Sequence, residues 1–375
     1  MKLKILIVVN SLEFFLSHRH SLAKEFVAND YEVTVITDMK GEIVNDPDLS
    51  FIDFSIDRAS INPVNIILKA LKLRRLLLRH NYDRYYFASH KSNVLGGLAS
   101  LFQFKIPTIF SISGLGYAFI DNSLKARLIK SIILMLYTIF AKQSKSTLVF
   151  QNNDDLKLFL DHGVLSDNKA KIIPGMGVDL KKFQFHPREK INPKAPIKVL
   201  FAGRLLLDKG IEEFIKLASK LKNKNFEFHI SGKLDTENPN AIDRIYFEES
   251  LEKSNIIYHG HTQFEQMFEL YKATDIFLLP SYREGFPKAA LEAAATGQPL
   301  LMSNVPGCRD CINNGFNGFL FEQGSIESME ACLYKLSNFS NYKNFSKNSR
   351  LYVEKNFSSS YIASCYIKLI QSNEL

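Results

Sequence analysis

Short apolar runs alternate with helical patterns along the whole of this chain of 375 residues. Runs such as Ile5–Val9 and Asp275–Leu279 are typical of strands buried in a parallel sheet whose two faces carry crossover helices. A single core rarely grows beyond about 250–300 residues, so we expect two domains. The predicted fold class is therefore α/β, with two doubly wound Rossmann-like domains.

The strands of each domain are read from these runs. In the first half we predict strands at Lys4–Val9, Glu32–Thr37, Phe51–Phe54, Arg84–Ala88, Thr108–Ile112 and Thr147–Phe150. In the second half we predict them at Lys198–Ala202, Phe226–Ile230, Ile256–Tyr258, Asp275–Leu279 and Pro299–Met302.

A stretch rich in glycine and proline separates the two sets of strands. Residues 174–196 contain six of these residues and predict an interdomain linker. We therefore expect a first domain of residues 1–173, to which we also assign a C-terminal helix at 356–375. The second domain is expected to span residues 197–355.

The net charge of +8 lies entirely in the first half. Residues 1–190 contain 26 Lys and Arg against 18 Asp and Glu, whereas residues 191–375 contain 21 of each. This excess predicts that the first half faces an anionic surface or substrate. No zinc finger or aromatic RNA-binding strand accompanies it, so an anionic membrane or a phosphorylated lipid is favoured over nucleic acid.

Two predicted helices bear on the membrane question. Ile66–Arg79 is basic and leucine-rich, which suits either a helix lying on anionic lipid or a crossover helix with its leucines on the sheet. Ile132–Phe140 is predicted to be a core helix, and its apolar run is far shorter than the roughly 20 residues needed to span a bilayer. With no export signal and four cysteines, a cytoplasmic location is predicted.

Two carboxylates, Glu284 and Glu292, stand around one predicted helix start. Pro287 suits the first turn of a helix, where its missing N–H costs nothing. The free N–H groups and the dipole of that helix form an anion site suited to a diphosphate. Because helical side chains lean toward the N-terminus, Glu292 reaches toward the same opening as Glu284. The pattern predicts a sugar-nucleotide site.

Residues that directly follow strands are the other candidates, because open parallel sheets bind ligands beyond the carboxyl ends of their strands. Arg204 and Lys209 follow the strand at Lys198–Ala202 closely enough to meet a diphosphate at the Glu284 turn. The polar loop that includes Gly232 can hold a base or ribose, although ordinary loop chemistry explains it equally well.

Two motifs resemble metal or redox sites but lack the context for them. Asp46-Pro-Asp48 lies in a turn-rich loop of the first domain, away from the predicted donor site. Cys308 and Cys311 form a single Cys-x-x-Cys with no second pair. We therefore predict no metal site.

Taken together, the motifs fit one pattern over nearly the whole chain. In the second half it comprises Gly203-Arg204 with Lys209, Asp275–Pro287 with Glu292, Gly297–Pro299, Val305–Gly307 and Asn317-Gly318. In the first half it comprises Phe14–Lys24, Arg58–Pro63, His90–Asn93 and Gly114–Phe119. The chain resembles glycosyltransferase family 4, in the bacterial branch that builds lipid-linked oligosaccharides for O-antigen and capsule and includes N-acetylgalactosaminyltransferases acting on undecaprenyl-diphosphate sugars.

This resemblance implies the type B glycosyltransferase fold (GT-B), with two domains facing each other across a cleft. The second would bind a UDP-sugar and the first an undecaprenyl-diphosphate-linked saccharide. A hexose or N-acetylhexosamine, with N-acetylgalactosamine as the best guess, would be transferred with retention at the anomeric carbon. No metal is expected, because cations and helix N–H groups stabilise the leaving diphosphate.

By position, the resemblance also assigns roles to residues. Arg204 and Lys209 would hold the donor diphosphate, Glu284 the sugar hydroxyls and Glu292 the ribose, and His90 would lie near the donor sugar. The expected catalytic set is His90, Arg204, Lys209 and Glu284. The expected donor-binding set is Arg204, Lys209, Gly232, Glu284, Gly285, Phe286, Pro287, Lys288 and Glu292.

One departure from the family concerns the first domain. The turn at Asn10–Ser17 lacks the glycines that many relatives place against the donor phosphates. We predict that Gly114 and Gly116 flank the cleft instead, and that Arg19 meets an acceptor phosphate. The alternatives are a sugar-nucleotide epimerase or hydrolase, against which the basic first half counts, and a catalytically silent binder. A dehydrogenase fits badly because no Gly-x-Gly-x-x-Gly follows the first strand.

Overall fold

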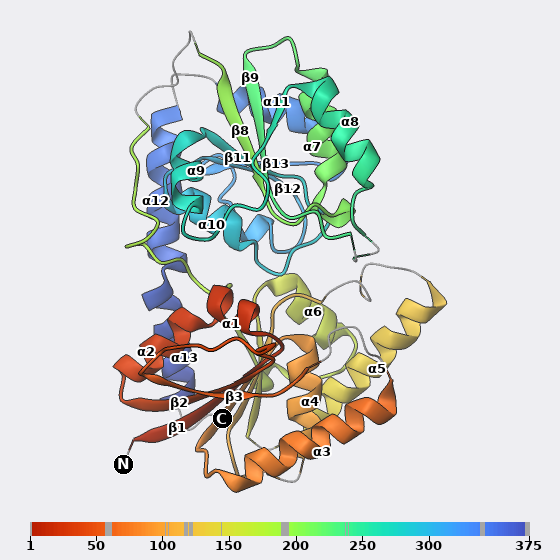
Figure 1. The fold of residues 1–375 in the computed structure, drawn as a ribbon, viewed down its shortest axis with the longest axis vertical. Coiled ribbons are helices and arrows are strands. Elements are labelled where there is room, and N and C mark those ends of the chain that lie inside the picture. The colour runs from red at the N-terminus through yellow and green to blue at the C-terminus, as the bar shows by residue number, and fades with distance from the viewer. Residues whose placement is uncertain are drawn as a thin grey trace. The chain divides into compact units, whose positions relative to one another are not determined.

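The computed structural model describes residues 2–56, 62–101, 103, 105–115, 119, 123–143, 145–188, 195–236, 238, 240–337 and 342–371. The chain forms two compact units, which are visible in Figure 1. The first unit comprises Met1–Met176 and Ser359–Leu375, and the second comprises Gly177–Ser358. The stretch predicted as a linker mostly belongs to the second unit, where Val178 and Phe183 are buried in the core.

The first unit is built on a seven-stranded sheet whose paired strands are all parallel. The strand order reverses between the neighbours β1 and β4, which makes the sheet doubly wound. In spatial order the strands are β3 (Leu49–Asp53), β2 (Tyr31–Thr37), β1 (Leu3–Val9), β4 (Arg84–Ala88), β5 (Thr108–Ile112), β6 (Ser146–Phe150) and β7 (Ala170–Ile172).

Helices cover both faces of this sheet, as alternation along β1 requires. Ile5, Ile7 and Val9 pack with α1 (Leu12–His18), α2 (His20–Ala28) and α13 (Ser359–Gln371). Leu6 and Val8 point to the opposite face, because successive strand residues alternate. There they pack with α3 (Pro63–Arg79), α4 (His90–Ser100), α5 (Leu124–Ala141) and α6 (Asn153–Asp161).

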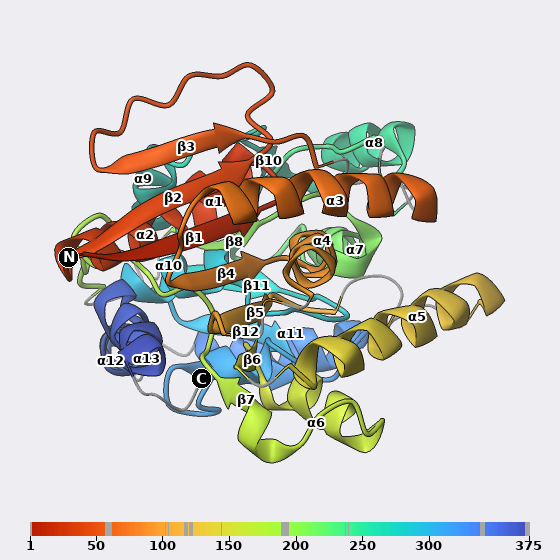
Figure 2. The same ribbon diagram turned by 90° about the horizontal axis from the view of Figure 1, so that it is seen from below.

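Helices α3 and α5 each bury one face and expose apolar side chains on the other. Figure 2 shows α4 between them, seen almost end-on. On α3, Ala70, Leu73 and Leu77 are buried, so the crossover interpretation is correct for this face. The exposed apolar residues are Val64, Ile67, Leu68, Leu71 and Leu78 on α3, and Leu124, Leu128, Ile132, Met135 and Ile139 on α5. The prediction that the second helix is core therefore holds for only one of its faces.

The second unit contains a six-stranded parallel sheet and one continuous core. In spatial order its strands are β10 (Ile256–Tyr258), β9 (Phe226–Ser231), β8 (Ile197–Ala202), β11 (Ile276–Leu279), β12 (Leu300–Ser303) and β13 (Gly318–Phe321). Its helices are α7 (Ile211–Lys220), α8 (Arg244–Ser254), α9 (Met267–Ala273), α10 (Lys288–Ala295), α11 (Ile326–Leu336) and α12 (Tyr342–Phe357). Short 3-10 helices lie at Asp167–Lys169 in the first unit and at Leu207–Lys209 (η3) and Arg309–Cys311 in the second.

All eleven predicted strands are present, with bounds that differ by no more than two residues. Two strands, β7 and β13, were not predicted. Strand β13 begins at Gly318, the second residue of the Asn317-Gly318 motif. A Cβ atom at Gly318 would lie 1.9 Å from the carbonyl oxygen of Leu300, so this strand pairs through a contact that only glycine allows.

Among the described residues, no helix is both long enough and apolar enough to cross a membrane.

Candidate active site

The loops after β9, β8, β11 and β12 converge in the second unit, because these strands are consecutive neighbours in the parallel sheet. Glycines allow the loops to approach closely. A Cβ atom at Gly232 would lie 1.8 Å from the carbonyl oxygen of Gly203, and one at Gly210 would lie 2.0 Å from that of Pro280. At Gly307 it would lie 2.4 Å from the carbonyl oxygen of Glu284. Close backbone packing thus shapes the site.

Glu284 lies at the centre of these loops and is only 9% exposed. Lys209, at the end of η3, places its Nζ atom 2.6 Å from the Oε2 atom of Glu284. Ser281 donates a hydrogen bond of 2.8 Å to the Oε1 atom. The structure thus brings together two residues of the predicted site and adds Ser281, which the sequence analysis did not identify. The sequence signal that could have identified Ser281 is its position three residues before Glu284.

Glu292 lies inside α10 and is 5% exposed. Its Oε2 atom accepts a hydrogen bond of 3.1 Å from the Tyr271 hydroxyl, and its Oε1 atom lies 3.1 Å from the Nζ atom of Lys288. Burial, reinforced by this carboxylate, holds the pKa of Tyr271 well above its ordinary value, so the phenol remains a hydrogen-bond donor. Tyr271 belongs to α9, and no sequence pattern connected it to Glu292.

An aromatic ring with two ammonium groups lies beside the same helix. The Nζ atoms of Lys182 and Lys288 lie 3.3 Å and 4.3 Å from the centroid of the Phe264 ring, at cation–π distance. The electrostatic influence of Glu292 extends to Lys182. Neither Lys182 nor Phe264 was predicted as a site residue, because each lies in a loop without a motif.

The start of α10 differs slightly from the predicted position. Helical residues begin at Lys288, and Pro287 is the N-cap residue with φ of −75°. Phe286 packs against Phe357, with ring centroids 5.2 Å apart, which anchors the approach to the helix. The helix therefore directs its N-terminal amides toward the region of Gly285 and Glu284, as an anion site requires.

Arg204 is the least constrained of the four key donor-site residues. Its side chain is 59% exposed and lies 3.9 Å from Asp235, an ion pair that contributes little on a solvated surface. Arg204 can therefore turn toward an anionic ligand at small energetic cost. Lys209 would first have to share or leave its bond to Glu284.

His90 begins α4 in the first unit, and both of its ring nitrogens are engaged. Its Nε2 atom lies 2.6 Å from the carbonyl oxygen of Gly114, to which it must donate, and its Nδ1 atom lies 3.1 Å from the Tyr137 hydroxyl. Tyr137 also accepts a hydrogen bond of 2.9 Å from Asn93. Burial lowers the pKa of His90, although the bond to Gly114 raises it, so the ring is neutral at neutral pH.

Arg19 is buried with 0% exposure, which a charged side chain rarely is. It donates to the hydroxyls of Ser113 and Ser111 at 2.9 and 3.3 Å, and its guanidinium lies over the rings of Phe14 and Tyr86. A direct contact with an acceptor phosphate would require this side chain to leave its present position.

The remaining first-unit candidate is the glycine pair. Gly114 has φ of 101°, a conformation that favours glycine, and it carries the carbonyl that His90 contacts. Gly116 and residues 58–61 of the Arg58–Pro63 motif lie outside the described residues.

The two motifs that resembled metal or redox sites have structural roles. Asp46 bonds to His20 and to Lys24 at 2.9 and 3.0 Å, and Lys24 also pairs with Asp48. Cys308 and Cys311 are buried, and burial holds the pKa of both thiols well above the ordinary value. Thiols of this kind are unreactive.

Comparison with known proteins follows the division into two units. Residues 182–352 match the family model described as "Glycosyl transferases group 1", and residues 4–153 match the one described as "Glycosyl transferase 4-like". One relative is N,N'-diacetylbacillosaminyl-diphospho-undecaprenol alpha-1,3-N-acetylgalactosaminyltransferase of Campylobacter jejuni. The two sequences are 34% identical over 325 aligned residues, and the alignment covers 81% of this chain and 83% of that protein. It is 28% identical over 302 residues to UDP-Gal:alpha-D-GlcNAc-diphosphoundecaprenol alpha-1,3-galactosyltransferase of Escherichia coli, covering 78% and 76% of the two chains.

Solved structures resemble the whole chain. Sucrose-phosphate synthase of Thermosynechococcus elongatus superimposes with a TM-score of 0.81 over 98% of each chain, at 18% identity. Anabaena HepE in complex with UDP and glucose superimposes with a TM-score of 0.76 over 99% of this chain and all of the other, at 16% identity. These likenesses confirm the predicted α/β fold class with two parallel sheets.

Proposed function

The chain belongs to glycosyltransferase family 4, and from this membership and the geometry of the second unit we propose that it uses a UDP-sugar to extend an undecaprenyl-diphosphate-linked saccharide. The transferred sugar is a hexose or N-acetylhexosamine, with N-acetylgalactosamine as the first candidate, because the relative from Campylobacter jejuni is named for that sugar. The setting is the assembly of O-antigen, capsule or a related glycan. The observation that carries the proposal is the ion pair of Lys209 with Glu284, whose side chain is only 9% exposed.

Different residues bind the diphosphate, the sugar and the ribose of the donor. Arg204 and Lys209 bind the diphosphate together with the N-terminal amides of α10, Glu284 accepts hydrogen bonds from sugar hydroxyls, and Glu292 accepts them from the ribose. The buried position of both carboxylates supports these roles, because hydroxyl groups satisfy a buried carboxylate without adding charge. Gly232 belongs to this site through its contact with Gly203.

In the proposed reaction, an acceptor hydroxyl oxygen forms a bond to the anomeric carbon of the donor sugar with retention of configuration. The bond from that carbon to the diphosphate oxygen breaks, UDP leaves with the electron pair, and the hydroxyl proton is released. Negative charge grows on the diphosphate, where two cations and helix amides stabilise it without a metal. The family resemblance assigns His90 to contact with the transferred sugar, and in that role a sugar hydroxyl would replace Gly114 as the partner of its Nε2 atom.

A direct test offers a panel of UDP- and GDP-sugars to the purified protein with a synthetic prenyl-diphosphate-linked saccharide. We expect one UDP-sugar to be transferred, and the Glu284→Gln variant to transfer it about a hundredfold more slowly. Epimerisation or hydrolysis of the donor in the absence of acceptor, at the rate seen with acceptor, would point to the alternative enzyme classes. If no donor reacts faster than with Glu284→Gln, the proposal is wrong.

We further propose that the protein acts at the cytoplasmic face of the bacterial cytoplasmic membrane, held there by the first unit. Helices α3 and α5 together contain eight lysines and arginines and no acidic residue. Each also exposes five large apolar side chains. Exposed apolar residues among cations are the pattern of helices that lie in the interface of anionic lipid.

Reversing charge on α3 should release the protein from vesicles. Arg74 is unsuitable, because its guanidinium donates to the carbonyl oxygens of Ala99 and Leu101 at 3.1 and 2.6 Å. We therefore choose glutamate at Lys72, Arg75 and Arg79, which are exposed. At about 1 kcal/mol per cation, binding to vesicles with one-quarter anionic lipid should weaken at least about a hundredfold.

The control reverses the same number of charges on the second unit, at exposed Lys216, Lys224 and Lys253. It should leave vesicle binding nearly unchanged in a co-sedimentation assay. Equal binding by wild type and the α3 variant would show that the first unit does not hold the protein on lipid.

A further inference from the structure

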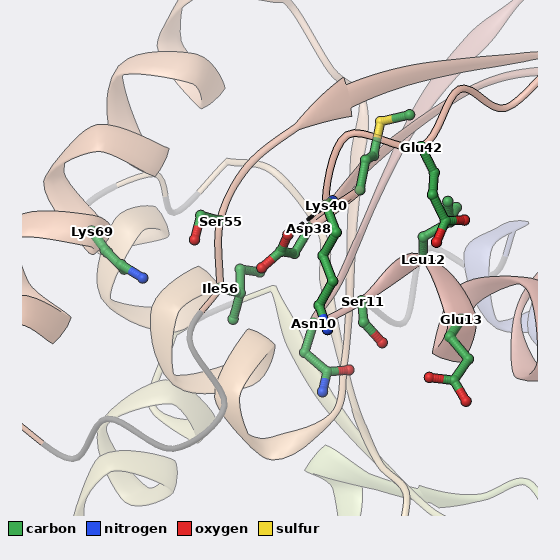
Figure 3. Close-up of a pocket in the computed structure, with 11 residues that line it drawn as sticks. Asn10, Ser11, Leu12, Glu13, Asp38, Lys40, Glu42, Ser55, Ile56 and Lys69 are labelled. Carbon is green, nitrogen blue, oxygen red and sulfur yellow. Dashed lines mark hydrogen bonds between the residues drawn. The ribbon is translucent and has the colours of Figure 1, made fainter.

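The first unit has a pocket of about 600 Å³ that the donor site does not use. Its lining comes from residues 10–13, 38–42 and 55–56, directly after the carboxyl ends of β1, β2 and β3, and from Lys69 of α3. Figure 3 shows this arrangement, with Lys69 and Glu13 at opposite sides of the view. The carboxyl ends of parallel strands are where sheets of this kind bind ligands, and the volume is that of an ordinary small-molecule site.

The pocket is lined by charged side chains that form no ion pair within the part of the chain that the structure describes. Five charged side chains line it, Glu13, Asp38, Lys40, Glu42 and Lys69, and none forms an ion pair with another described residue. On the same unit, by contrast, Lys24 pairs with both Asp46 and Asp48. Charged groups gathered around an open pocket without mutual pairing are available to a ligand.

One buried atom in the pocket also lacks a partner. The Oδ1 atom of Asn10 is buried and accepts no hydrogen bond from any described residue. An unsatisfied buried acceptor costs about 1–3 kcal/mol, a cost that a ligand's donor would remove when the Asn10 amide turns toward the pocket. In Figure 3 the Lys40 side chain extends toward Asn10, and Asp38 lies beside it. A ligand with O–H or N–H groups would complete this set.

A nucleotide fits the pocket poorly, although Asp38 follows the second strand as in nucleotide-binding folds. Two amides at the start of α1 are already engaged, because Ser11 caps the N–H of Phe14 at 3.2 Å and Leu12 donates its N–H to the carbonyl oxygen of Asp38 at 3.1 Å. Glu13 adds negative charge in the first turn, where it repels phosphate. Carboxylates and an amide oxygen suit hydroxyl groups instead.

We infer that this pocket binds the saccharide of the acceptor, with Asp38 and Asn10 accepting its hydroxyl or amide protons and Lys69 meeting its phosphate. The inference rests on the proposed function for the identity of the ligand as an acceptor. Lys69 is the residue that connects sugar and lipid, because it lies on α3 between Leu68 and Ala70, and α3 exposes Ile67, Leu68 and Leu71. A lipid-linked diphosphate at Lys69 can thus keep its prenyl chain near the exposed face of this helix.

The test measures dissociation constants by ligand-observed NMR for three probes. These are a prenyl-diphosphate-linked N-acetylhexosamine, the methyl glycoside of the same sugar, and inorganic diphosphate. Asp38→Asn keeps the oxygen that accepts from the Lys40 N–H at 3.2 Å, so the fold should persist. It should weaken binding of both sugar probes about tenfold and leave diphosphate unchanged. Lys69→Met should weaken the two diphosphate-containing probes about tenfold and leave the methyl glycoside unchanged.

Matched controls lie on the same unit outside the pocket. Glu32→Gln removes a carboxylate from β2, and Lys105→Met removes an exposed cation; both should bind all three probes as wild type does. If Asp38→Asn and Lys69→Met also bind like wild type, the pocket does not hold the acceptor. Weaker UDP binding by Asp38→Asn would identify a nucleotide site and overturn the inference.

Transfer kinetics separate this inference from the proposed function. Both pocket variants should raise KM for the lipid-linked acceptor about tenfold while KM for the donor stays the same. If the wild-type protein transfers no sugar but still binds the acceptor probe through Asp38, the proposed function fails and the pocket assignment survives.

Discussion

Replacing Lys209 with methionine is expected to lower the rate of sugar transfer by about a hundredfold or more, the usual loss when one group that stabilises a growing negative charge is removed. The same change should destabilise the second unit. Lys209 lies 2.6 Å from Glu284, which is only 9% exposed, so the variant leaves a buried carboxylate with Ser281 as its remaining partner. Breaking a buried pair in this way typically costs about 3–5 kcal/mol.

A double variant separates the two effects. Lys209→Met combined with Glu284→Gln removes both charges, so most of the lost stability should return while transfer stays slow. Lys216→Met is the control, since its pair with Glu212 on α7 is exposed and should contribute less than about 1 kcal/mol. Denaturant midpoints and kcat/KM for the donor are the measurements. A Lys209→Met protein with the wild-type rate would remove Lys209 from the mechanism.

Gly232→Ala is expected to be a strongly disruptive small substitution in the second unit. Its new methyl group would lie 1.8 Å from the carbonyl oxygen of Gly203, and backbone atoms cannot move aside cheaply. The loops after β8 and β9 would have to separate, at a cost of about 1–3 kcal/mol or more. Because Arg204 directly follows Gly203, the donor site would be displaced together with the loop. We expect lower stability and a higher KM for the donor.

Gly203→Ala is the matched control, because Gly203 is the other residue of the close contact with Gly232. A Cβ atom there would meet only the Phe201 ring, at 3.8 Å, an ordinary packing distance. Its denaturant midpoint should therefore stay close to that of wild type. If Gly232→Ala unfolds at the same denaturant concentration as Gly203→Ala, the close approach of the two loops does not control the stability of this unit.

Most of the fold could be predicted because the strand signal is local. The apolar runs of β1 and β11 stand out in the sequence, whereas β7 and β13 are short strands at the edges of their sheets. Helix α5 shows the limit of this approach. Its apolar residues were assigned to the core, but the sheet covers only one of its faces and leaves Leu128 and Met135 exposed.

The candidate site was predicted in composition more than in arrangement. Glu284, Glu292, Arg204 and Lys209 were all predicted, because each stands at a strand end or a helix start, and the structure brings Lys209 and Glu284 into contact. Their partners were not. Tyr271 on α9 contacts Glu292 across 21 positions of sequence, and no periodicity relates the two. The pocket beyond β1, β2 and β3 was likewise invisible, since its lining residues are separated by long stretches of chain.

The sequence by itself determined the α/β class, the order of the strands along the chain and the residues that carry charge, because periodicity and ionisation are properties of short segments. Only the tertiary structure decided which of these charges meet. Lys209 and Glu284 are 75 residues apart, and they pair because β8 and β11 are neighbours in the sheet. Glu13 of α1, Lys69 of α3 and the charged residues after β2 surround the first-unit pocket because the fold brings those segments together, and none of these side chains forms an ion pair with a described residue. Contacts between residues that are far apart in the sequence depend on the order of the strands in space, which local sequence does not encode.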